Sequence, residues 1–223
     1  MGYRLKLVAF AASAVGFLIL LNVGYSAANT LSQLDKVEAE RDQWQRPLDI
    51  LQALGPAAGE TIVDLGCGSG YFTLKLSAAV GNRGRVIAED VRWLPLAFLR
   101  ARTILKGRHN VSVVHGRPDS ARLPVNGVNA VLILNTYHEV SDPHAILAQV
   151  RQALVSGGRL VVVDRQPNPA NVGVTENGEH EIPVSSVEAE LRQMGFEIAG
   201  RQDRFIESDP ERETWWLLVA RRP

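Results

Sequence analysis

Apolar residues in the larger part of this chain alternate between short continuous runs and stretches in which they recur every three or four positions. Continuous runs are typical of strands buried on both faces of a sheet, and the wider spacing is typical of helices that pack by one side. This alternation predicts an α/β fold. The predicted strands cover residues 61–65, 85–89, 111–115, 128–134 and the run that ends at 164, which a glycine turn at 156–158 is predicted to precede. The predicted helices cover 47–54, 71–80, 91–107, 142–154 and 185–194.

Two further apolar runs, 196–204 and 213–221, close the chain with no helix between them. The polar stretch 207–211 joins them, so they predict a hairpin. Trp215 and Trp216 lie in the second run, and because neighbours in a strand point to opposite faces, we expect both in the core on different sides of the sheet.

A glycine-rich loop follows the first strand, at 66–70, and leads directly into the helix 71–80. The unpaired N–H groups and positive dipole at a helix start suit a polar or anionic part of a ligand, which indicates a nucleotide-type pocket. The spacing is G-x-G-x-G followed by the bulky Tyr71, whereas a dinucleotide fingerprint has G-x-G-x-x-G. Asp64 stands two residues before the first glycine, where its carboxylate would reach a ligand ammonium.

The run Asp64-Leu-Gly-Cys-Gly-Ser-Gly70 resembles the first motif of the class I S-adenosylmethionine-dependent methyltransferases. The resemblance implies a Rossmann-like, seven-stranded, mostly parallel sheet whose last strand inserts antiparallel. It also implies S-adenosylmethionine as cofactor, bound by Asp64, Gly66, Cys67, Gly68 and Gly70. Cys67 is interpreted as a small residue beside a closely approaching ligand, with a reactive thiol as the alternative.

Acidic residues at the ends of later strands extend the predicted cofactor site. The second strand ends in Glu89 and Asp90, and a carboxylate at this place usually binds the ribose hydroxyls in nucleotide-binding α/β folds. Alignment with the family pattern favours Asp90, and Glu89 is the second candidate because a shift of one residue exchanges their faces. Many relatives have an acid just after the third strand, but Arg117 stands there, which leaves Asp119 as the adenine-binding candidate.

Polar and ionisable residues also follow the fourth strand, in Asn135-Thr-Tyr-His-Glu-Val140. Open α/β sheets bind ligands at the carboxyl ends of central strands, so Asn135 is a further cofactor candidate. The Tyr-His-Glu run is similar to that of a subgroup of small methyltransferases, in which it faces the methyl acceptor. His138 is the predicted general base, Glu139 would orient it or act as a second acid, and Tyr137 would line the acceptor or stack on the adenosyl group. No metal site is predicted.

Composition and charge restrict the partners. The 223 residues are 46% hydrophobic, enough for one domain with a full core and an extension. Two of the 24 basic residues and none of the 24 acidic ones lie in residues 1–28, which leaves 22 basic against 24 acidic and argues against nucleic acid as a partner. The arginines of the helix 91–107, at 92, 100 and 102, are expected on its solvated face. The sequence leaves the oligomeric state open.

Residues 1–34 are predicted to form a separate unit, and 35–223 the methyltransferase domain. Arg4 and Lys6 precede an uncharged run, 7–34, that suits either a cleaved signal peptide or a retained hydrophobic helix anchoring the chain in the inner membrane. A buried helix of the fold is the third reading. Any membrane contact would involve residues 7–28. The charge distribution predicts a cell-envelope location with the domain outside the cytoplasm, which conflicts with the cytosolic supply of S-adenosylmethionine.

The sequence is therefore compatible with three functions. The first is methyl transfer from S-adenosylmethionine to a small-molecule or lipid-like acceptor. The second is a non-catalytic, membrane-tethered module that binds the same cofactor, and the third is a dinucleotide-dependent oxidoreductase. Trp44 is expected as a lid residue or as a packing anchor, and His180, in the long loop 165–183, as a surface or a functional histidine.

Overall fold

The computed structural model describes residues 2–167, 181–207 and 213–223, with the backbone alone for residues 2–21 and 23. His180 and most of the loops around it and around residue 210 lie outside the described residues. The chain forms two units, residues 1–43 and 44–223. Helix α1 (Gly2–Trp44) makes up the first unit and ends at the first residue of the second. Among the residues whose side chains the structure describes, no helix combines the length and apolar character needed to cross a membrane.

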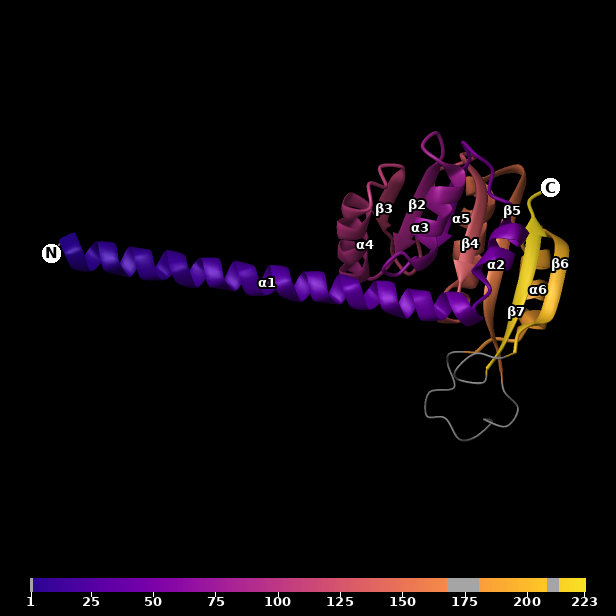
Figure 1. Cartoon of the computed structure of the whole chain (residues 1–223). Helices are drawn as coiled ribbons and strands as arrows, with labels where there is room; N and C mark the ends of the chain where they lie inside the picture. Colours follow the sequence, from indigo (N-terminus) through magenta and orange to yellow (C-terminus); the bar gives the residue numbers. More distant parts are fainter. Residues whose placement is uncertain (1, 168–180, 208–212) are drawn as a thin grey trace. The chain divides into compact units, whose positions relative to one another are not determined.

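The second unit is built on one seven-stranded sheet in the order β3-β2-β1-β4-β5-β7-β6 (Figure 1). Its first five strands are parallel, and β7 runs antiparallel between β5 and β6. This confirms the predicted Rossmann-like fold with its closing hairpin. The strands are β1 (Thr61–Leu65), β2 (Arg85–Asp90), β3 (Val111–His115), β4 (Val128–Leu134), β5 (Leu154–Gln166), β6 (Glu197–Ile206) and β7 (Thr214–Arg221).

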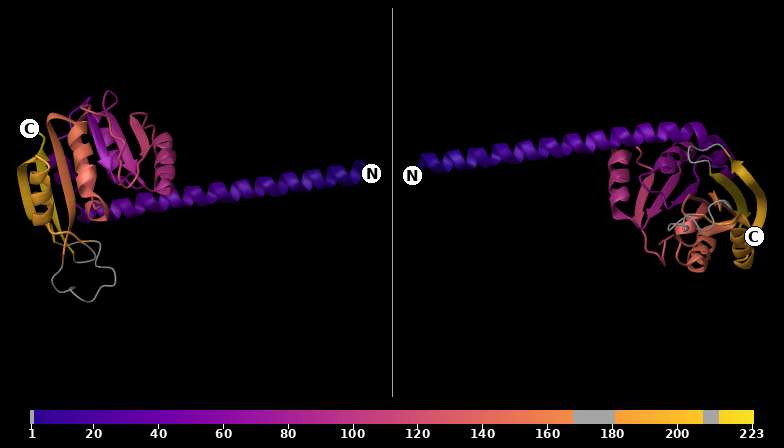
Figure 2. Two further views of the ribbon diagram at one scale, coloured as in Figure 1. Left: turned by 180° about the vertical axis from the view of Figure 1, so that it is seen from behind. Right: turned by 90° about the horizontal axis from the view of Figure 1, so that it is seen from below.

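Helices cover both faces of the sheet, as Figure 2 shows from two further directions. On one face lie α2 (Pro47–Leu54), α3 (Tyr71–Val80) and α4 (Trp93–Leu105), and on the other lie α5 (Pro143–Ala153) and α6 (Val184–Gln193). Alternate residues of the central strands supply the two cores: Ile62 and Leu132 pack with α2 and α3, whereas Val63 and Val131 pack with α5 and α6. Continuous apolar strands are required because neither face meets water.

The aromatic residues of the hairpin are in the core, as expected. Trp215 packs in the α2–α3 core and Trp216 in the α5–α6 core. Trp44 packs on Trp215 with 5.8 Å between ring centroids, which matches the expected packing anchor.

Two local predictions are wrong. Arg102 is only 2% exposed, and its guanidinium donates to the carbonyl of Ser69 in the glycine loop, so it does not lie on the solvated face. The turn expected at residues 156–158 lies inside β5, which begins at Leu154 immediately after α5. The spacing of apolar residues did not reveal that Arg102 is buried, because α4 has few polar residues and its inner face is therefore ambiguous.

Candidate functional site

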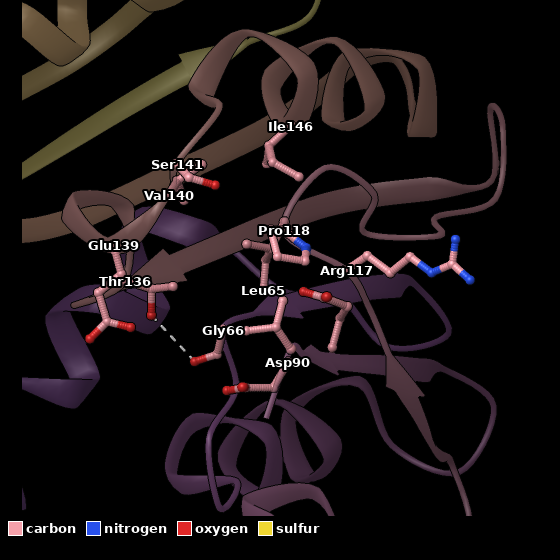
Figure 3. Close-up of a pocket in the computed structure, with 12 residues that line it drawn as sticks. Leu65, Gly66, Asp90, Arg117, Pro118, Thr136, Glu139, Val140, Ser141 and Ile146 are labelled. Carbon is pink, nitrogen blue, oxygen red and sulfur yellow. Dashed lines mark hydrogen bonds between the residues drawn. The ribbon is translucent and has the colours of Figure 1, made fainter. Parts of the chain in front are cut away.

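A cavity of about 210 Å³ opens where the carboxyl ends of β1, β2 and β4 meet (Figure 3). β1 lies between the other two strands, and Leu65 pairs with both Glu89 and Ile133, so the three strands end at the same level. Polar groups that follow these strands therefore converge. The cavity is lined by Leu65, Gly66, Glu89, Asp90, Val91, Arg117, Pro118, Thr136, Glu139, Val140, Ser141 and Ile146.

The glycine loop holds one edge of this cavity. The carbonyl of Glu89 accepts the N–H groups of Gly66 and Cys67, at 2.8 and 2.9 Å, which fixes the loop to β2. Gly66 has φ +73°, and a Cβ on it would come within 2.2 Å of the Thr136 side chain, so the two segments touch. Gly68 also has a positive φ, +53°, but nothing lies within 4 Å of a Cβ added there. Its bare backbone thus leaves room for a ligand to approach closely.

Asp90 and Glu89 both line the cavity and are each 3% exposed. Asp90 accepts the N–H of Gly68 at 2.9 Å and the N–H of Arg92 at 2.8 Å, which joins the end of β2 to the glycine loop. Oδ1 also accepts the Nε–H of Arg92 at 3.4 Å, whereas Oδ2 keeps a further lone pair for a hydroxyl donor. The sequence treated the two acids as alternatives, whereas the structure places both at the cavity.

Burial raises the pKa of the Glu89 carboxyl. Desolvation, reinforced by the negative charge of Asp90 and opposed by a backbone N–H of the glycine loop, raises the pKa of the Glu89 carboxyl to about 8. The group is therefore mostly neutral at pH 7 and can donate a hydrogen bond as well as accept one. An added Cβ on Gly116 would lie 1.6 Å from Glu89 Oε1, so this carboxyl packs directly against a backbone.

Asp64 and Cys67 are buried and do not line the cavity. Asp64 Oδ2 accepts the hydroxyl of Thr73 on α3 at 2.5 Å, which joins the end of β1 to the helix that follows the loop. The predicted contact of Asp64 with a ligand ammonium stays a prediction. Burial raises the pKa of the Cys67 thiol, with the charges of Asp64 and Asp90 adding to the effect, so the thiol is neutral. Because the thiolate is the nucleophilic form, a neutral thiol favours the interpretation of Cys67 as a small packing residue over a reactive thiol.

The predicted catalytic run forms one turn of 3₁₀ helix, η1 (Tyr137–Glu139), whose three side chains point in different directions. Tyr137 is 1% exposed in the α5–α6 core, and its hydroxyl donates to Glu190 on α6. Burial, followed by this contact, raises the pKa of Tyr137. Tyr137 does not line the cavity, so its predicted role beside the acceptor or the adenosyl group stays a prediction, without support from its position.

His138 and Glu139 remain together. The imidazole of His138 is 2% exposed, and its Nδ1 lies 2.7 Å from Oδ1 of Asp164, which is fully buried near the end of β5. The second oxygen of Asp164 accepts the backbone N–H of His138 at 3.2 Å. Nε2 of His138 lies 3.8 Å from Oε1 of Glu139, whose side chain is 49% exposed and lines the cavity. Glu139, rather than His138, is thus the residue at the cavity surface.

The two remaining predicted residues do not line the cavity, although each adjoins a lining residue in the chain. Asn135 has φ +52°, and its buried Oδ1 has no hydrogen-bond partner among the residues that the structure describes. A buried acceptor of this kind at a strand end suits a donor from a bound molecule. Asp119 is exposed and does not line the cavity, and its carbonyl accepts from Gln149 on α5. Its adenine-binding role stays a prediction, without support from its position.

Sequence reasoning missed several residues of the site. Asp164 ends an apolar run, and its polarity at a strand end was the only indication of its partner, 26 positions away. Thr136 hydrogen-bonds the Gly66 carbonyl at 3.4 Å across the cavity edge (Figure 3). Val91, Pro118 and Ile146 give the cavity its apolar walls, and no sequence pattern distinguishes them from ordinary loop and helix residues.

The chain is similar in sequence to known methyltransferases. Residues 62–158 match the model of a family described as a methyltransferase domain. The chain is 29% identical over 140 residues to a demethylmenaquinone methyltransferase of Shouchella clausii, covering 63% of this chain and 57% of the relative. It is 31% identical over 122 residues to a ubiquinone/menaquinone biosynthesis C-methyltransferase of Shewanella frigidimarina, covering 54% and 48%. The chain thus spans about half the length of the curated relatives it matches.

Solved structures share the fold. A SAM dependent methyltransferase from Aquifex aeolicus superposes with a TM-score of 0.71 and 21% identity, covering 86% of this chain and 98% of that one. A geranyl diphosphate methyltransferase in complex with SAM gives 0.67 and 16%, covering 80% and 85%. A [4+2]-cyclase gives 0.68 and 18%, covering 80% and 81%. Because a cyclase shares the fold, the fold by itself does not determine the reaction.

Proposed function

We propose that this chain, which carries a class I methyltransferase domain, transfers the methyl group of S-adenosylmethionine to a small apolar acceptor with an ionisable hydroxyl, such as a quinol. The observation that carries the proposal is one cavity in which Gly66 of the glycine loop, two buried acids and an exposed carboxylate meet among apolar walls, with the open backbone of Gly68 bonded to one of the acids, Asp90.

The residues present fit the cofactor. The bare backbone at Gly68 leaves space for the methionine part, and Asp90 and the neutral Glu89 supply an acceptor and a donor for ribose hydroxyls. Val91 and Pro118 offer apolar surface for a flat base. When bound, S-adenosylmethionine supplies a methyl group on a positively charged sulfur, an electrophile that needs no further activation.

The task left to the protein is alignment and proton removal. Holding the acceptor against the reacting group supplies about 7 to 11 kcal/mol of the barrier. We propose that the Glu139 carboxylate, which lines the cavity, takes the proton of a hydroxyl on the acceptor. The oxyanion that remains makes the quinol ring electron-rich. His138, held through its Nδ1 by Asp164, lies behind Glu139 and stabilises the carboxylate or takes the proton on. Such base assistance contributes roughly a hundred- to ten-thousand-fold.

The quinol-like acceptor is supported by the relatives, whose names describe methylation of quinone precursors, and by the apolar walls formed by Leu65, Val140 and Ile146. The match to these relatives covers about half of their length.

Calorimetry on the full chain tests the cofactor. S-adenosylmethionine and its demethylated product should bind, and NAD should not. Binding of NAD alone would favour the oxidoreductase instead.

Turnover with a quinol acceptor and labelled S-adenosylmethionine tests the proposed base. Glu139→Gln should lower turnover by about a hundredfold or more while cofactor affinity stays nearly constant. His138→Gln should also lower it, and Glu197→Gln, an exposed position on β6, should not. Cofactor binding without methylation of any acceptor would favour the non-catalytic module.

The location of the chain is a separate proposal. We infer from residues 1–34 a cell-envelope location, by export or by anchoring, which rests on the sequence pattern alone. A reporter fused to the carboxyl terminus distinguishes the two sides of the membrane. A cytosolic reporter would contradict export and would remove the difficulty of cofactor supply.

A further inference from the structure

The outer surface of α4 is apolar although it faces solvent. Trp93 and Leu94 at its start are 68% and 50% exposed, and Ile104 and Leu105 at its end are 76% and 72% exposed. Val91, just before the helix, is 47% exposed. These five residues are called the α4 apolar face below. Large apolar side chains grouped on one surface in this way mark an interaction site.

The other side of the same helix already packs on the sheet. Leu96 and Leu99 are buried against Ala88 and Cys67, and α4 lies over the β2–β3 edge (Figure 1). The helix therefore needs no further apolar residues for folding. Ala97 and Ala101 lie between the two ends of the α4 apolar face at helical spacing from Leu94, so small side chains connect them along the helix.

Basic residues surround this face and acidic ones are absent from the segment. No Asp or Glu occurs between positions 91 and 118, and six cationic side chains do. Arg102 is buried on the glycine loop, and Arg92 pairs with Asp90. Of the remaining four, Arg100 lies on the helix, Lys106 and Arg108 follow its end, and Arg117 follows β3; all four are exposed or half-buried. A helix with exposed Trp and Leu beside cations has the chemistry of a segment that lies in the interface of an anionic bilayer.

We infer that the α4 apolar face rests on a bilayer containing anionic phospholipid, with Trp93 and Leu94 inserted at the level of the headgroups. Tryptophan favours this depth because its ring is apolar and its N–H is polar. Val91 connects the face to the cavity, since it is exposed and also lines the cavity wall. A membrane-dissolved acceptor would then reach the cavity along apolar surface. The contact itself does not depend on the proposed methyl transfer.

Fluorescence of Trp93 tests the contact in the full chain. Trp215 and Trp216 are buried, so the difference between wild type and Trp93→Phe isolates an exposed tryptophan. The probes are vesicles of brominated phosphatidylcholine, with or without phosphatidylglycerol. With phosphatidylglycerol, the Trp93 emission should shift to the blue and lose most of its intensity to bromine quenching. Arg100→Gln with Lys106→Gln should reduce the quenching to the level seen with phosphatidylcholine alone.

A matched control uses Val125, which is 70% exposed and precedes β4, at the opposite end of this strand from the cavity. In a Trp93→Phe background, Val125→Trp should stay unquenched. If Trp93 stays unquenched while the chain sediments with the vesicles, α4 is not the contact and the inference is wrong. Blue-shifted Trp93 emission without vesicles that reverts on dilution would instead assign the face to a second copy of the chain, which also overturns it. Calorimetry with S-adenosylmethionine reads the proposed function separately.

Discussion

Glu89→Gln should change how stability depends on pH, because the wild-type carboxyl is neutral in the fold and ionised in the unfolded chain. Its pKa rises from 4.5 to about 8, chiefly through desolvation. Since the folded pKa is above the unfolded one, stability from this group is complete below pH 4.5 and falls as pH rises to 8. With these two values, linkage gives a loss of about 2.5 kcal/mol between pH 5 and pH 7. Glutamine cannot ionise and removes this loss.

Urea unfolding of the full chain, followed by the emission of the buried Trp215 and Trp216, measures the effect. The free-energy difference between Glu89→Gln and wild type should grow in favour of the variant by about 2.5 kcal/mol between pH 5 and pH 7, which is roughly 1.2 kcal/mol per pH unit. Glu197→Gln should follow the wild type across the range. Parallel curves for Glu89→Gln and wild type would refute the neutral carboxyl, and with it the donor role at the ribose.

Three other variants test the geometry of the site. Gly68→Ala should weaken S-adenosylmethionine binding in calorimetry at a stability cost of only about 1 kcal/mol or slightly more, because φ is +53° but the added Cβ meets only open space. Gly66→Ala should destabilise by about 2 to 4 kcal/mol in urea unfolding. Thr136→Ala in the same chain should restore only the part due to Cγ2 and Oγ1 of Thr136, since the Cβ of residue 136 stays 2.7 Å away and φ +73° remains strained. Tyr137→Phe should cost about 1 to 2 kcal/mol of stability, through loss of the bond to Glu190, with unchanged cofactor affinity; a large loss of affinity would return Tyr137 to the site.

Gly66, Asp90 and Glu139, which line the cavity, could be predicted as site residues from the sequence. The glycine loop and the acids at the end of β2 follow strands whose apolar runs identify them, and parallel strands bring their carboxyl ends to one edge. The acceptor side was less predictable. The run Tyr137 to Glu139 was correctly placed after β4, but a single 3₁₀ turn directs three neighbours to the core, to Asp164 and to the cavity.

The succession of strands and helices along the chain, the closing hairpin and the glycine loop follow from the amino-acid sequence, because they depend on periodicity and on local backbone preference. The fold was needed to show that Arg102 contacts the glycine loop, that burial raises the pKa of Glu89 and that Asp164 holds His138. Each of these depends on burial or on a partner distant in sequence, and neither is encoded in the spacing of nearby residues.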